Sequence, residues 1–125
     1  MSANELIPQD VSDFLLKTIA SVAELEALLL MRREMVSWSP ETLAQRLYVP
    51  PAEAELVLRA LMSLGFVVQD DEGYRYECVA PELDRMVERI AEVYARQLIP
   101  VTKLIHDHGR RIRRFADAFR LRRDS

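Results

Sequence analysis

The placement of proline and glycine after residue 39 restricts the fold of this chain more than any other feature. Ser39 is a favourable N-cap, and the prolines at positions 40 and 51 suit the first turn of a helix. A residue before proline avoids the helical region, so Pro50 ends the first helix, and Gly65 suits the end of the second. The sequence therefore predicts two short helices, from Pro40 to about Leu47 and from Pro51 to about Leu64, joined by a tight turn.

The residues that follow Gly65 have the pattern of a β-hairpin. The segments FVVQ at 66–69 and YRYE at 74–77 alternate in the manner of strands, and DDEG joins them. Gly73 supplies the positive φ that such a tight turn requires. A short two-stranded hairpin is therefore expected directly after the second helix.

Amphipathic sequence precedes these elements. Residues 10 to 33 carry apolar side chains at helical spacing. Within them, Ser21 and Glu24 form the S-x-x-E pattern of a capping box. This pattern favours one helix that ends near Ala20 and a second that begins at Ser21, rather than one long helix.

A long helix is also expected after the hairpin. It opens at Pro81, and Pro100 is predicted to end or kink it. Gly109 predicts a further break before the C-terminus. These boundaries divide the chain into an N-terminal helix (1–20), a central segment (21–80), a long C-terminal helix (81–105) and a tail (106–125).

The composition indicates one folded, mainly helical protein. The 125 residues are half apolar and 30% charged, with three glycines and six prolines. Cys78 is the one cysteine, so no internal disulfide is expected, and a buried apolar role is the commoner one for such a residue. The N-terminal sequence MSANELIPQD lacks the features of a secretory signal, and the apolar run at 28–31 is too short to span a membrane. We therefore expect a cytoplasmic protein.

Positive and negative charges are distributed unevenly along the chain. Residues 1–100 hold 9 Lys/Arg against 17 Asp/Glu, whereas residues 101–125 hold 8 against 3. The tail combines an apolar stripe with seven arginines: Arg110, Arg111, Arg113, Arg114, Arg120, Arg122 and Arg123. Such a segment is typical of a solubilising terminus, of a phosphate-binding arm, of a helix that docks on an acidic partner or on the acidic body of its own chain, or of a helix at a membrane surface.

The phrases ETLAQRL before the turn, LVLRALMSLGFV after it and YRYE in the hairpin resemble winged helix-turn-helix transcriptional regulators. The resemblance covers residues 20 to 98, and the long flanking helices are similar to those with which the MarR-like branch forms dimers. The tail motif FADAFRLRRD is similar to that of small bacterial winged-helix proteins. The resemblance implies a mainly α, winged helix-turn-helix fold, in which residues 51–64 read the major groove of DNA and the hairpin, the wing at residues 69–75, reaches the adjacent minor groove or backbone.

The charge of residues 39–77 departs from that pattern. This segment holds three arginines against seven carboxylates, a formal charge of −4, whereas affinity for DNA depends on cations placed against phosphates. Two hypotheses follow. The leading one is a homodimeric regulator that binds double-stranded DNA, with the tail supplying phosphate contacts. The alternative is a protein-interaction module that binds a sigma factor, RNA polymerase or another regulator without binding DNA.

The first hypothesis assigns two sets of residues. The candidate DNA contacts are the polar and basic side chains of the two helices, the wing and the tail: Gln45, Arg46, Arg59, Gln69, Arg75, Arg110, Arg111, Arg113 and Arg114. The candidate dimer seam is apolar, although the same residues are equally suited to a plain core: Phe14, Leu15, Leu83, Met86, Val87, Ile90, Val93 and Tyr94.

The remaining candidates favour no catalytic chemistry. Trp38 is expected to cover the core beneath the wing, because large aromatic residues are usually packing. His106 and His108 are expected to be polar linker residues, since metal sites usually take three or four well-placed ligands. The chain has no Gly-rich phosphate loop, no G-x-S-x-G and no H-E-x-x-H motif. We therefore expect no enzyme activity, no metal and no cofactor.

Overall fold

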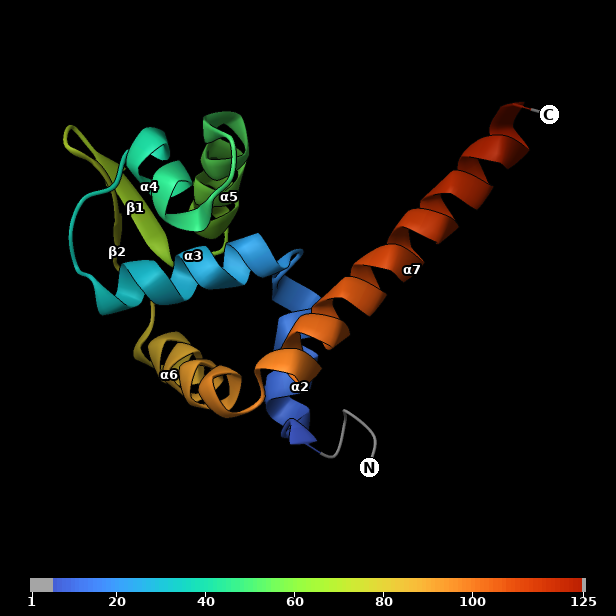
Figure 1. The fold of residues 1–125 in the computed structure, drawn as a ribbon, viewed down its shortest axis with the longest axis horizontal. Helices are drawn as coiled ribbons and strands as arrows, with labels where there is room; N and C mark the ends of the chain where they lie inside the picture. Colours follow the sequence, from blue (N-terminus) through green and yellow to red (C-terminus); the bar gives the residue numbers. More distant parts are fainter. Residues whose placement is uncertain (1–5, 125) are drawn as a thin grey trace. The chain divides into compact units, whose positions relative to one another are not determined.

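A computed structural model describes residues 6–124, and the side chains of residues 6–111. The described residues are mainly helical, which confirms the mainly α class (Figure 1). The elements in chain order are α2 (Gln9–Thr18), α3 (Val22–Arg33), α4 (Pro40–Leu47), α5 (Pro51–Ser63), β1 (Val67–Asp70), β2 (Gly73–Tyr76), α6 (Pro81–Arg96) and α7 (Leu98–Asp124).

The chain divides into two compact units. One unit is Ala23–Glu92, which contains α4, α5, the hairpin and most of α3 and α6. It holds seven Lys/Arg against fourteen Asp/Glu, a formal charge of −7, and we call it the acidic unit. The other unit joins residues 1–22 to residues 93–125 and contains α2 and α7. It holds ten Lys/Arg against six Asp/Glu, a formal charge of +4, and we call it the basic unit.

The start of α4 and the turn to α5 follow the local sequence signals. The Ser39 hydroxyl accepts a hydrogen bond of 3.1 Å from the Thr42 amide, and the Thr42 hydroxyl accepts one of 3.0 Å from the Ser39 amide. This capping box satisfies two backbone donors at the helix start. Tyr48 ends α4 in the left-handed region, with φ 58°, before the two prolines. Both helices and the tight turn between them are confirmed.

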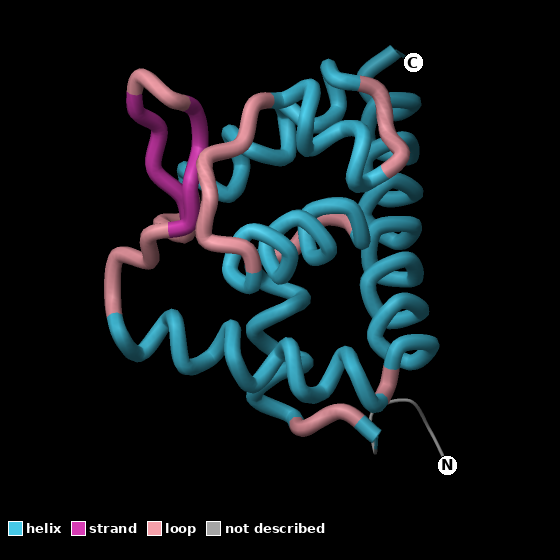
Figure 2. Tube along the Cα trace, turned by 60° about the vertical axis from the view of Figure 1, so that its left-hand side comes forward, coloured by secondary structure: helices cyan, strands magenta, loops and turns pink. Residues whose placement is uncertain are grey.

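The predicted hairpin is present, with each strand displaced by one residue toward the turn, and it gains a backbone partner that the sequence did not indicate. β1 and β2 form the hairpin drawn in magenta in Figure 2. They pair antiparallel from Val67 opposite Tyr76 to Asp70 opposite Gly73, and Gly73 has a φ of +133°. Trp38 lies alongside β2: its amide donates to the Tyr74 carbonyl at 2.6 Å and its carbonyl accepts from the Tyr74 amide at 2.8 Å. The segment between α3 and α4 is thereby fixed to the hairpin.

The core of the acidic unit lies where α4, α5 and β1 meet, and these elements are drawn side by side in Figure 1. Leu43 of α4, Leu58 and Leu61 of α5 and Phe66 before β1 are fully buried. Trp38 is also buried, as predicted, and its indole nitrogen has no hydrogen-bond partner within the described residues.

The helix that begins at Pro81 ends earlier than predicted. α6 stops at Arg96, and Pro100 lies inside the first turn of α7 instead of ending the preceding helix. A proline clashes with the carbonyl four residues before it, here that of Arg96, and it lacks an amide proton; both defects are tolerated in a first turn. The chain therefore breaks at Gln97, three residues before Pro100.

The predicted break at Gly109 is wrong, because α7 continues through this residue. A glycine in a helix interior costs only about 1 kcal/mol relative to alanine, so it does not end a helix whose earlier turns are anchored by packing. Val101, Leu104 and Ile105 of α7 are buried. The predicted division of residues 10–33 into two helices is confirmed, since α2 ends at Thr18 and α3 begins at Val22.

No helix within the described residues is both long and apolar enough to cross a membrane.

Candidate interaction surface

Arg46 of α4 is held by an acid and an aromatic ring. Its guanidinium donates to the two carboxylate oxygens of Glu34, at 3.1 and 2.6 Å, and lies 5.5 Å from the centre of the Trp38 ring. The hydrogen bond from Arg46 lowers the pKa of Glu34, and the same bond raises the pKa of Arg46. This bidentate pairing offsets the charge that a DNA contact would use.

The other two arginines of residues 39–77 are paired as well. Arg59 donates to Glu55 on the same helix at 3.1 Å. Arg75 donates to Asp70 at 3.0 Å and to Glu77 at 3.1 Å, across and along the hairpin. The hydrogen bond from Arg75 lowers the pKa of Asp70. All three arginines of this segment therefore donate hydrogen bonds to carboxylates. The formal charge of the segment is −4.

Large apolar side chains are exposed on α5 and in the turn before it. Tyr48 is 94% exposed, Leu56 is 69% exposed and Met62 is 37% exposed. Glu53 is also exposed, and with Glu55 it flanks Leu56 on the helix surface. Glu53 and Leu56 are three positions apart and lie on the same side of the helix. We call the surface made by these two residues the α5 face.

Tyr48 was not predicted to have a role. It follows the last apolar position of α4 and precedes two prolines, so the sequence predicts that it lies in a turn. The sequence does not predict that its side chain is exposed. A bulky residue with positive φ is an outlier that costs about 1–2 kcal/mol, and such strain gathers at functional positions. Tyr48 is therefore an exposed, conformationally strained residue that the sequence did not indicate.

The other candidate DNA contacts lie on several elements of the two units. Gln45 and Gln69 are exposed on α4 and β1. Arg110 and Arg111 are exposed on α7, which belongs to the basic unit. The side chains of Arg113 and Arg114 lie outside the described residues.

The candidate dimer seam lies in or beside the core of the single chain. Leu15, Val87, Ile90 and Tyr94 are buried. The other four residues are half-buried: Phe14, Leu83, Met86 and Val93. The seam was inferred from the length of the helix that begins at Pro81, which ends at Arg96, and the dimer stays a prediction. An apolar stripe has the same spacing in either case, which is why the sequence could not separate core from seam.

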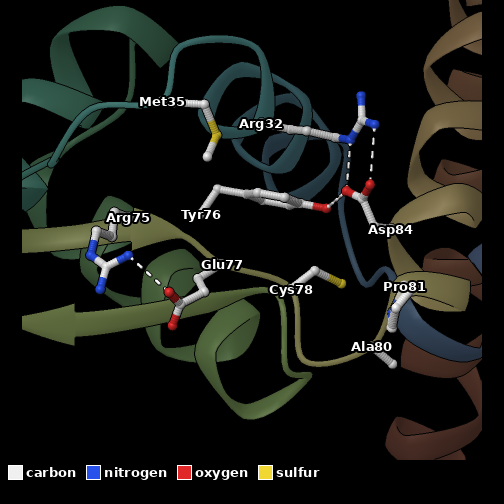
Figure 3. A pocket seen from close by; sticks show the side chains of 9 residues that line it. All are labelled: Arg32, Met35, Arg75, Tyr76, Glu77, Cys78, Ala80, Pro81 and Asp84. Atoms are coloured by element: carbon white, nitrogen blue, oxygen red, sulfur yellow. Dashed lines mark hydrogen bonds and ion pairs between the residues drawn. The ribbon is translucent and has the colours of Figure 1, made fainter.

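A second site of the acidic unit is an open hollow of about 580 Å³ beside the end of β2 (Figure 3). Arg32 donates to both carboxylate oxygens of Asp84, at 3.0 and 3.4 Å, and the Tyr76 hydroxyl donates to the same carboxylate. Met35 and Cys78 also line the hollow. The cluster joins α3, β2 and α6 by hydrogen bonds, so we expect it to stabilise the folded acidic unit.

The pKa values in this cluster predict a stability profile with two declines. The hydrogen bond from Arg32, with that from Tyr76, lowers the pKa of Asp84 below its ordinary value of 3.8, so this stabilisation is lost as the pH falls below about 4. Burial, with the hydrogen bond to Asp84, raises the pKa of Tyr76 above its ordinary value of 10.0. That stabilisation is lost as the pH rises above about 10.

We expect the urea midpoint of unfolding to be level between these limits. Asp84→Asn is expected to flatten the acid decline, and Tyr76→Phe the alkaline decline, because neither replacement ionises. Urea unfolding followed by circular dichroism from pH 3 to 11 measures both. An alkaline decline of unchanged slope in Tyr76→Phe would show that this phenol is not its source.

The described side chains offer no metal centre. Within residues 6–111, no three His, Cys, Asp or Glu side chains gather in a way that would hold an ion. His108 lies beside Gly109 in a smaller hollow of the basic unit, lined by the C-terminal end of α2. Cys78 is half-buried.

Comparisons with known proteins do not assign a function to these surfaces. Searches of protein-family models, of curated proteins and of solved structures gave no match to this chain.

Proposed function

We propose that residues 39–77 form a winged helix that serves as a protein-interaction module in transcription control, with the α5 face as its contact surface. The observation that carries this proposal is the pairing of Arg46, Arg59 and Arg75 with carboxylates. Duplex DNA presents a dense row of phosphates, and binding to it requires cations that are not already neutralised. The segment that would face the duplex offers no such cation among its arginines.

The composition of the α5 face supports a protein partner. The exposed Leu56 offers an apolar contact from which a protein partner can exclude water. Glu53 at the edge favours a partner whose own surface is apolar and basic, because opposite charges steer the encounter and fix its orientation.

The test replaces Leu56 with arginine in the full chain. Arginine is a good helix former, so α5 is expected to keep its structure, while the apolar contact is lost and a positive charge faces the basic partner. Retention of a protein partner from a lysate of cells that naturally make this chain is expected to fall at least tenfold. Quantitative mass spectrometry of the retained proteins measures this.

Two further results separate a protein partner from DNA. Val79→Arg is the matched control, because Val79 is 77% exposed in the acidic unit outside the α5 face, and retention is expected to stay unchanged. If the α5 face bound DNA, Leu56→Arg would strengthen binding to a labelled duplex instead of weakening retention of a protein. Equal retention by Leu56→Arg and the wild type would contradict the proposal.

A second candidate function is DNA binding through α7. The observation that favours it is the exposure of Arg110 and Arg111 at the start of the arginine-rich segment. Fluorescence anisotropy of a mixed-sequence duplex, measured at several salt concentrations, tests it. Salt-sensitive binding whose logarithmic slope falls by about 0.9 for each arginine replaced in Arg110→Gln and Arg111→Gln would support this function. No binding at low salt would exclude it.

A further inference from the structure

We propose that the outer edge of β2 binds an extended peptide, which adds a strand beside residues 76–78 and places a basic side chain next to Glu77. The outer edge is the side of β2 that faces away from β1. None of the residues involved belongs to the α5 face, so this inference does not depend on the proposed function.

The backbone groups of Tyr76 face the outer edge. In an antiparallel pair, residues that are hydrogen-bonded to the partner strand alternate with residues that are not. Glu77 donates to the Phe66 carbonyl at 3.0 Å on the β1 side, whereas Tyr74 exchanges two hydrogen bonds with Trp38 on the other side. Tyr76 lies two positions from Tyr74, so its amide and carbonyl face the same side as those of Tyr74. Within the described residues neither group has a backbone partner.

The segment between α3 and α4 does not continue along this edge. Since Trp38 is bridged to Tyr74 in antiparallel fashion, a continued strand would place Val36 opposite Tyr76. The Val36 amide donates instead to the Glu34 carbonyl at 2.7 Å, in a tight turn, and the Val36 side chain is 54% exposed. The pairing therefore stops at Trp38, and the next donor and acceptor of β2 are left for a strand from another molecule.

The hollow of about 580 Å³ lies at this part of the edge and gives room for a side chain (Figure 3). Residues directly opposite each other in an antiparallel pair point to the same face of the sheet. The peptide residue opposite Tyr76 therefore lies on the face where Tyr76 contacts Asp84. Met35 and Pro81 line the hollow, and Arg32 already donates to Asp84, so an apolar side chain suits this position.

The neighbouring peptide residue points to the opposite face, as Arg75 and Glu77 do on either side of Tyr76. Arg75 donates to both Asp70 and Glu77, so two carboxylates share one guanidinium and the cluster has a formal charge of −1. Asp70 and Glu77 are exposed, and the acidic unit carries a formal charge of −7. A lysine opposite Glu77 would neutralise the cluster, and the negative field of the unit attracts it.

The direction of the peptide fixes the order of these two residues. A strand that continues the line of Trp38 runs antiparallel to β2, so the residue opposite Glu77 precedes the residue opposite Tyr76. The recognised order is therefore a basic residue followed by an apolar one. Main-chain hydrogen bonds supply the affinity of an added strand, and the alternate side chains supply its specificity.

The test uses the isotopically labelled full chain and the blocked tetrapeptide acetyl-Thr-Thr-Lys-Val-amide. Nuclear magnetic resonance measures the hydrogen exchange of single backbone amides. In the free chain we expect the Tyr76 amide to exchange at least tenfold faster than the Tyr74 amide, which donates to Trp38. At saturation the peptide is expected to slow the Tyr76 amide at least tenfold and to leave the Tyr74 amide unchanged.

Two matched peptides separate strand addition from attraction of charge alone. Methylation of the valine amide nitrogen keeps every charge but removes the donor to the Tyr76 carbonyl, and acetyl-Thr-Thr-Glu-Val-amide reverses the charge opposite Glu77. Each is expected to bind at least tenfold more weakly in a chemical-shift titration. Equal binding of the methylated peptide would overturn the proposal, because no main-chain hydrogen bond would then be involved.

A pair of variants locates the contact on the chain. Met35→Arg places a positive charge in the hollow, on a side chain that is 67% exposed, and is expected to weaken binding of the lysine peptide at least tenfold. Met62→Arg makes the same charge change in the acidic unit outside the hollow, and binding is expected to stay within twofold of the wild type. Equal effects of the two variants overturn the proposal, as does a wild-type chain that binds no peptide or protects Tyr76 and Tyr74 equally when free.

Discussion

Gly73→Ala is expected to destabilise the acidic unit by about 3 kcal/mol, because the new side chain meets two separate costs. The φ of +133° at this position belongs to a region that only glycine occupies readily. A Cβ atom here would also lie 2.6 Å from the backbone carbonyl oxygen of Trp38. Since that carbonyl accepts a hydrogen bond from Tyr74, the hairpin cannot yield to the new atom without loss of the bridge to Trp38.

Urea unfolding followed by tryptophan fluorescence measures this loss, and Trp38, the one tryptophan of the chain, reports from the position under strain. Gly65→Ala is the matched control. Gly65 has a φ of +89°, but its Cβ atom would meet the Val79 side chain, which is exposed and can move. The control is therefore expected to cost clearly less. Equal losses in the two variants would show that the close approach to Trp38 adds nothing.

Phe66→Ala is expected to cost about 3–5 kcal/mol, the range for truncating a buried phenylalanine. Phe66 is fully buried between the end of α5 and the start of β1. Its amide donates to the Leu61 carbonyl at 3.1 Å and its carbonyl accepts from the Glu77 amide at 3.0 Å, so the backbone on both sides is fixed. A site held in this way collapses little around a cavity, which places the expected cost high in that range.

Thermal and urea unfolding of the full chain measure the effect of Phe66→Ala. Met62→Ala, four residues earlier, removes an apolar side chain that is 37% exposed and sits on a helix where alanine is favourable. It is expected to cost less than about 1 kcal/mol. A small loss in Phe66→Ala would mean that the packing between α5 and the hairpin contributes little to stability.

Elements that depend on short-range signals could be predicted from the sequence. The capping pair at Ser39, the prolines at 50 and 51 and the glycine at 73 act on their own backbone or on residues within four positions. Their effects do not depend on what packs against them. The two errors, at Gln97 and Gly109, arose where a local signal was weak: a proline fits the first turn of a new helix, and a single glycine is outweighed by the buried turns before it.

The candidate site was predictable only in part. Counting residues showed that acids outnumber arginines between 39 and 77, and this excess already weighed against a usual contact with DNA. It did not show which acid holds which arginine. Glu34 lies twelve positions before Arg46, directly after the end of α3, so the pair exists only because the folded chain brings this position close to α4.

The sequence by itself determined where most helices and turns begin, the order of the elements and the opposite charges of residues 1–100 and 101–125, because these follow from local conformational preference and from composition. Only the tertiary structure decided that Trp38 joins the hairpin, that the apolar stripe of α6 is partly buried within one chain, and that Tyr48 and Leu56 face solvent. The physical reason is that burial and pairing depend on which surfaces meet in space, and an amphipathic pattern specifies that a face will be covered without specifying what covers it.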